Sequence, residues 1–126
     1  MVKVPTLAFL TRRKSESPTE LPVGPLELLA ATYQQGDFVT LVFNQPINTI
    51  ALNGAMISVD DPNTGFLYQA LGEVDLLSPA ILRLGLMEVG GSSMSFVYLI
   101  ADPGNGIKPM GGNIEWEGIM ERLPYP

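Results

Sequence analysis

The amino-acid sequence predicts an all-β fold: an antiparallel β-sandwich of about seven strands behind an extended N-terminal arm. From residue 26 onward, short apolar runs alternate with turn signals roughly every eight to twelve residues. Within these runs apolar and polar side chains alternate, as a sheet with one buried and one wet face requires. The 13 glycines and 11 prolines are spread along the chain, so no segment is uninterrupted for long enough to form a stable long helix.

The expected strands are bounded by Gly, Pro, Asn, Asp, Gln or Ser, the residues that favour turns. They cover residues 26–33, 38–43, 55–59, 66–71, 80–87, 94–101 and 113–119. The first of them, over 26–31, also fits one or two helical turns. The strand at 94–101 is apolar on both faces, which indicates a cover of the outer face by a partner or by the arm.

The alternating faces predict which side chains form the core. In 38–43 the odd-numbered residues point inward, and in 113–119 Ile114 and Trp116 are expected to share the buried face between Glu115 and Glu117. The expected core contains Val39, Leu41, Phe43, Ile57, Val59, Leu82, Leu84 and Trp116.

One stretch of the chain carries a family resemblance. It reads Gly36-Asp37-Phe-Val-Thr-Leu-Val-Phe43-Asn-Gln-Pro46-Ile47, followed by Leu52-Asn53-Gly54-Ala-Met-Ile-Ser-Val59. This order of a tight turn, an alternating strand ending in Phe, a polar-Pro turn and a short strand resembles the opening strands of bacterial Ig-like domains, which also occur on tailed-phage particles. The resemblance covers residues 26–119 in pattern and implies an immunoglobulin-like sandwich used for attachment. It carries over no functional residue, and the cysteine pair of antibody domains is absent.

Charge divides the chain into an arm, residues 1–25, and a domain, residues 26–126. Residues 1–14 contain four basic residues and no acid, whereas residues 15–126 contain 13 acids and three bases, within a total of −6. Three prolines and few apolar groups predict that residues 11–25 are extended. We expect an apolar part of the arm to add as a strand to an exposed sheet edge and a basic part to pair with carboxylates beyond it. The expected partner-binding residues are Leu7, Phe9, Leu10, Arg12, Arg13 and Lys14.

The sequence predicts a protein that is not an enzyme and has no cofactor. It contains no cysteine and no histidine, and neither nucleophile nor phosphate-loop motifs occur.

The oxygen-rich segment Asp60–Gly65 fits a calcium loop or a hairpin turn, and we interpret it as a turn because it lacks the EF-hand spacing. Asp102–Gly106 is also interpreted as a turn. Trp116 fits the core better than a sugar-stacking site. An acidic body disfavours nucleic acid, and no apolar run is long enough to span a membrane.

These observations favour a non-catalytic virion structural protein that decorates a phage capsid or joins head and tail components by protein–protein contacts. Its expected partners are other virion proteins and further copies of itself, in a homo-oligomer. The expected location is the virion, assembled in the host cytoplasm, because the apolar start is short and broken by Pro5 and predicts no signal peptide. The alternative is an adhesion or carbohydrate-binding Ig-like module of a bacterial surface protein.

Overall fold

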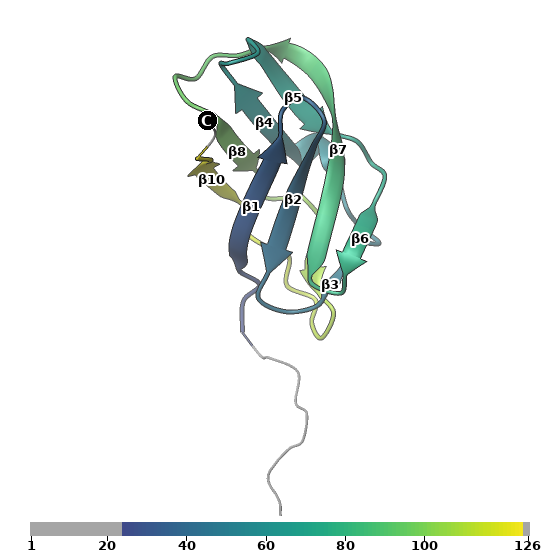
Figure 1. Ribbon diagram of the computed structural model, residues 1–126. Coiled ribbons are helices and arrows are strands. Elements are labelled where there is room, and N and C mark those ends of the chain that lie inside the picture. The colour runs from purple at the N-terminus through teal and green to yellow at the C-terminus, as the bar shows by residue number, and fades with distance from the viewer. Residues whose placement is uncertain (1–23, 125–126) are drawn as a thin grey trace, which may run out of the picture.

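The structure of the protein is a computed structural model that describes residues 24–124 (Figure 1). Strands dominate this part of the chain, which contains one short 3-10 turn and no α-helix. Every strand pairing in it is antiparallel. The predicted all-β antiparallel fold class is therefore confirmed. The expected arm lies outside the described residues, except for Gly24 and Pro25.

Ten strands and the 3-10 turn follow one another along the described chain. They are β1 (Leu28–Gln34), β2 (Phe38–Phe43), β3 (Ile47–Asn48), η1 (Gly54–Met56), β4 (Ile57–Asp61), β5 (Phe66–Ala70), β6 (Asp75–Ser78), β7 (Ile81–Gly91), β8 (Tyr98–Ala101), β9 (Lys108–Pro109) and β10 (Ile119–Arg122).

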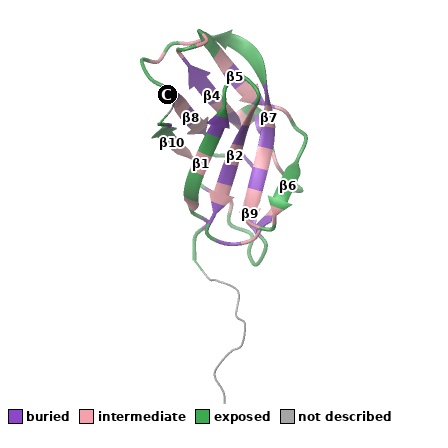
Figure 2. Ribbon diagram, viewed as in Figure 1, coloured by how far each residue is buried: buried purple, intermediate pink, exposed green. Residues whose placement is uncertain are grey.

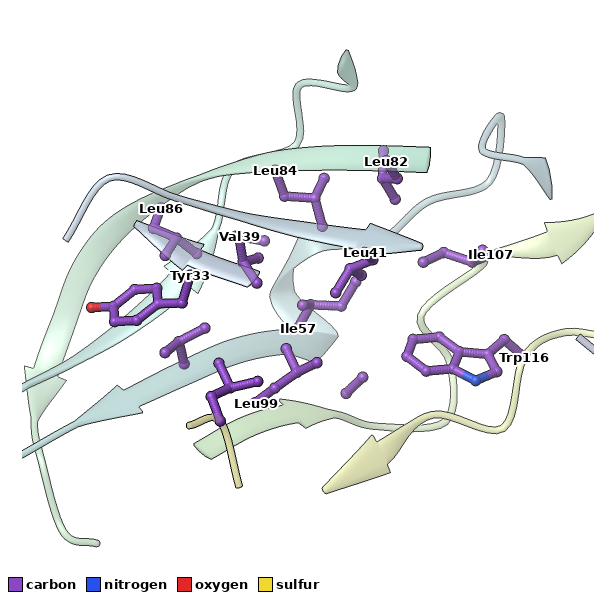
Figure 3. Packing of buried hydrophobic residues seen from close by; sticks show 14 of the residues in the cluster. Tyr33, Val39, Leu41, Ile57, Leu82, Leu84, Leu86, Leu99, Ile107 and Trp116 are labelled. Atoms are coloured by element: carbon purple, nitrogen blue, oxygen red, sulfur yellow. The ribbon is translucent and has the colours of Figure 1, made fainter. Parts of the chain in front are cut away.

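The main sheet is curled, in the order β1-β2-β7-β5-β4-β8-β10, with β6 beside β7 and with β3 and β9 forming a separate small pair. The long strand β7 makes the curl possible. Its first half, Ile81–Gly85, pairs with β2, and its second half, Leu86–Gly91, pairs with β5. The sheet thus folds over on itself, with β1, β2, β6 and early β7 facing β4, β5, β8 and β10 (Figures 1 and 3).

The core fills the space between these two parts of the sheet (Figure 3). All eight side chains expected inside are buried, and the most exposed of them, Trp116, is only 4 % exposed. Alternation is visible along β2 and early β7, where every second residue is buried (Figure 2). Leu99 from β8 and Ile107 from the loop before β9 are among the further side chains buried in the core. Period-two patterning therefore predicted the inward face of the central strands.

A buried hydrogen bond ties the two parts of the sheet together near the β1–β2 turn. The Tyr33 hydroxyl of β1 donates to Oδ2 of Asp61 at the end of β4, at 2.7 Å, and accepts from the Gly36 amide at 2.9 Å. Burial and the bond to Asp61 raise the pKa of the Tyr33 phenol above its ordinary value of 10.0. The β1–β2 and β4–β5 turns therefore lie at the same end of the domain, opposite the end where β1 begins.

The last expected strand, over 113–119, is wrong in position, since β10 begins only at Ile119. Trp116 lies in the loop before it and is buried because its amide donates to the Ile107 carbonyl and its ring meets Phe43 edge-on at 5.1 Å. Ile114, expected on the same buried face, is 82 % exposed. The pair Gly111-Gly112 precedes this segment and interrupts regular strand geometry.

Other boundaries also differ from the prediction. Residues 26–31 belong to strand β1 and its lead-in, so the helical alternative for them is wrong. Strand β8 occupies only the second half of 94–101. The exposed side of β2 has cover from within the domain, because the Arg83 guanidinium lies 4.9 Å from the centre of the Phe38 ring. The short strands β3, β6 and β9 were not predicted.

Candidate interaction surface

The structure describes the body of the domain and not the predicted partner-binding residues. Leu7, Phe9, Leu10, Arg12, Arg13 and Lys14 all lie outside residues 24–124. What the structure does place is the point where the arm joins the body. Gly24 and Pro25 lie just before β1, at the end of the domain opposite the β4–β5 turn (Figure 1). We call this end the foot.

An apolar hollow of about 410 Å³, here named the foot groove, opens beside this junction. Its walls are Gly24–Leu26, Gln45, Pro109 and the segment 111–114. The Ile114 side chain is 82 % exposed on one wall, and the neighbouring Met110 is 58 % exposed. Large apolar groups that are open to water around a hollow are typical of a binding surface.

The wall nearest the arm is held in place by Gln45. Its side chain is buried, and Nε2 donates to the carbonyl oxygens of Gly24 at 3.2 Å and Pro25 at 3.4 Å. On the opposite wall, the Met110 amide donates to the Pro46 carbonyl at 2.9 Å, next to the β3–β9 pair. Hydrogen bonds to main-chain carbonyls therefore fix both walls of the foot groove.

The loop behind the groove is fixed by Glu115 and Asn105. The Glu115 carboxylate accepts hydrogen bonds from the amides of Gly104 at 2.7 Å and Gly106 at 2.8 Å. The fully buried Asn105 donates to the Trp116 carbonyl and accepts from the Ile107 amide. These contacts support the interpretation of Asp102–Gly106 as a structural turn, and they hold the segment that leads into 111–116.

A second hollow, of about 370 Å³, adjoins the foot groove and is here named the acidic gap. It lies between residues 25–28 and residues 116–119, where β1 and β10 begin. These strands are the two ends of the sheet order, and they are not paired with each other within the described residues. Glu27 and Glu117 are exposed on its two sides, and Pro25 and Leu26 line both hollows.

Two of the three basic side chains in the described part of the body are engaged with partners of their own. Over residues 24–124 there are 11 acidic and three basic residues, which leaves a charge of −8. Arg83 forms an ion pair with Asp75 at 2.7 Å, and the Arg122 guanidinium lies 3.5 Å from the centre of the Phe96 ring. The body therefore presents a predominantly negative surface.

The Asp60–Gly65 segment uses its carboxylates within the protein. Asp61, besides its bond to Tyr33, accepts at Oδ1 from the Asn63 amide at 2.8 Å, which is ordinary hairpin chemistry. Asp60 is buried on the other face of β4 and accepts from the Ser92 hydroxyl and from the Ser93 amide. These contacts support the turn interpretation.

No group of three or more His, Cys, Asp or Glu side chains within residues 24–124 could hold a metal ion. In the same part of the chain, no helix has the length and apolar character needed to cross a membrane. Trp116 is buried against Phe43, so its ring faces are not open for stacking on a sugar.

No family model, curated protein or solved structure matches this chain.

Sequence reasoning missed the foot groove and the acidic gap because it assigned residues 113–119 to a strand. A strand would have turned Ile114 inward beside Trp116. The signal that could have found the exposed loop was the pair Gly111-Gly112, a turn element that precedes Asn113.

Proposed function

We propose that the protein is a non-catalytic structural subunit of a phage particle: an Ig-like sandwich that decorates a capsid or joins head and tail components through protein–protein contacts. In this proposal the basic arm is the assembly element, and the acidic body is the surface that receives an arm.

The strand order supports the Ig-like part of the proposal. An Ig sandwich has its first, second, fifth and fourth strands in one sheet and its third, sixth and seventh in the other, with an added strand beside the third in variable-type domains. Here β1, β2, β7 and β6 lie side by side in that manner, and β10, β8, β4 and β5 follow the second pattern. The departure is β7, which continues past β2 to pair with β5.

The observation that carries the functional part is the exposure of large apolar side chains on an otherwise well-packed domain. Twelve such residues are exposed among those described, while the central strands bury every inward side chain. Where such side chains border an apolar hollow, as Ile114 does at the foot groove with Met110 next to it, they are typical of a surface that is covered by a partner. By contrast, the carboxylates of Asp60, Asp61 and Glu115 accept hydrogen bonds from backbone amides of the same domain.

The alternative, a carbohydrate-binding surface module, has less support. Its aromatic platform would have been Trp116, which is 4 % exposed. Stacking on a sugar requires a solvent-exposed ring face, and the Trp116 ring is buried, so a sugar cannot reach it.

Peptide mass spectrometry of purified phage particles tests the proposal, with lysate of the same producing cells as the control. We expect this chain in the particles at a copy number comparable with that of an established structural protein. Its absence from particles, with clear detection in the producing cells, would contradict the proposal.

A further inference from the structure

We infer that the foot of each domain receives the arm of a second copy of this chain, with Leu7–Leu10 in the foot groove and Arg12–Lys14 at the acidic gap. This inference rests on the proposed function, because it specifies where the assembly arm binds. The sequence suggested only that the arm adds to an exposed sheet edge, whereas the foot groove and the acidic gap are a defined site for it.

The order of residue types in the arm matches the order of the two hollows. Leu7-Ala8-Phe9-Leu10 is apolar, and after one Thr it is followed by Arg12-Arg13-Lys14. On the body, the apolar foot groove and the acidic gap meet at Pro25 and Leu26, which line both. An extended chain covers about 10 Å in three residues, so neighbouring apolar and basic groups of one strand reach adjacent hollows.

Charge favours this placement over other apolar surface of the domain. Glu27 and Glu117 are exposed on opposite sides of the gap, and no basic residue lines it. The other hollow with several carboxylates, beside β6, contains Arg83, already paired with Asp75. A segment with three adjacent positive charges therefore meets at the foot two carboxylates that no basic residue within 24–124 neutralises.

The sequence between arm and body favours a second copy as the donor. Nine residues, 15–23, connect Lys14 to Gly24, and they include Pro18 and Pro22. Proline-rich segments of this kind extend by roughly 3.1 Å per residue and resist reversal. Binding to its own foot would require the chain to turn back sharply, because the foot groove begins at Gly24 itself. Because the sequence of this segment favours extension, we expect the apolar residues to reach a neighbouring copy rather than the foot beside Gly24.

Disulfide trapping between two differently substituted full-length chains tests the site directly, since the natural chain has no cysteine. An arm variant carries Ala8→Cys, and a groove variant carries Asn113→Cys on the groove wall. The matched control is a turn variant, Asn63→Cys, which changes another asparagine at the opposite end of the domain. Under mild oxidation we expect the arm variant to form a disulfide-linked heterodimer with the groove variant at least about tenfold faster than with the turn variant, because docking raises the local concentration of the thiols.

Charge exchange tests the acidic gap independently. Replacing Glu27 and Glu117 by Lys should weaken self-association at low salt, whereas Glu73→Lys with Glu88→Lys, a change of the same size elsewhere, should not. Adding Arg12→Glu, Arg13→Glu and Lys14→Glu to the Glu27→Lys, Glu117→Lys chain should restore association.

The apolar part of the site is tested by Ile114→Ser in the foot groove. This change should lower the association constant about 10- to 100-fold, because the interface then no longer buries one isoleucine side chain.

The outcomes separate this inference from the proposed function. Preferential heterodimers of the arm and groove variants, with rescue by charge exchange, support the site. An internal disulfide in a monomeric chain carrying both Ala8→Cys and Asn113→Cys would overturn the second copy as donor. Equal trapping of the arm variant by the groove variant and the turn variant would overturn the site. A chain that stays monomeric in solution, yet is found in particles, would overturn the inference and leave the proposed function standing.

Discussion

Replacement of Gly118 by Ala should destabilise the domain by about 3–5 kcal/mol, because two separate costs meet at this residue. Gly118 precedes β10 and lines the acidic gap. Its φ of +88° lies in the left-handed region, which costs an L-residue about 1–2 kcal/mol. A Cβ there would also lie 2.0 Å from the Ala101 carbonyl oxygen on β8. Backbone atoms cannot yield as a flexible side chain can, so the start of β10 must move away from its partner strand.

Gly65 provides the matched control. Its φ of +83° is nearly the same, but a Cβ at this position meets nothing within 4 Å. Gly65→Ala should therefore cost only the backbone strain, partly offset by lower entropy of the unfolded chain, or roughly 0.5–1.5 kcal/mol. The difference between the two variants, about 2.5–3.5 kcal/mol, isolates the contact with Ala101.

Urea unfolding followed by fluorescence measures both free energies of unfolding. The chain has a single tryptophan, and Trp116 is buried against Phe43, so its emission reports on the loss of the core. For a domain of this size, 1 kcal/mol corresponds to a shift of roughly 4–8 °C in Tm, which gives a second readout. Equal losses of stability for Gly118→Ala and Gly65→Ala would refute the reasoning, because they would show that the close approach to Ala101 does not restrict the backbone.

Three further predictions concern the core, alkaline pH and ions. Leu41→Ala should cost about 2–5 kcal/mol of unfolding free energy, whereas Leu29→Ala on the exposed side of β1 should change it by less than about 0.5 kcal/mol; similar losses in urea titrations would contradict the assigned faces. Because the folded pKa of Tyr33 is raised, the native state retains a proton that the unfolded state releases above about pH 10, so stability should fall there as pH rises. The stability advantage of the parent over Tyr33→Phe should accordingly shrink as the pH rises above about 10, and a constant difference would argue against the buried phenol. EDTA should leave Tm unchanged if residues 60–65 form only a turn, and a drop of several degrees that calcium reverses would identify an ion site.

The central strands could be predicted from the sequence because a single physical rule dominates them. Val39 and Leu41 on β2, like Leu82 and Leu84 on β7, face the core from strands buried on one side, and burial imposes a period of two. The curl of the sheet could not be predicted in the same way. It depends on β7 changing partners midway, and no residue pattern in the strand records which neighbour lies beside each half.

The foot was harder to predict because its structure depends on side-chain contacts with backbone groups distant in sequence. Glu115 is a polar residue between apolar ones, and alternation then assigns Ile114 and Trp116 to one strand face. In the fold, Glu115 instead binds the amides of the 102–106 turn and Trp116 enters the core from a loop, which leaves Ile114 outside. Contacts of this kind arise from tertiary structure and leave no periodic trace in the sequence.

The role of the arm in assembly is tested most directly by light scattering coupled to size-exclusion chromatography, at low and high salt. The experiment compares the self-association of the full chain with that of a chain lacking residues 1–14. The full chain should associate at low salt and dissociate at high salt, because salt screens the attraction between the basic arm and the acidic body. The shortened chain should remain monomeric at both salt concentrations, with an unchanged far-UV spectrum. Identical masses for the two proteins under all conditions would contradict the assignment of the arm as an assembly element.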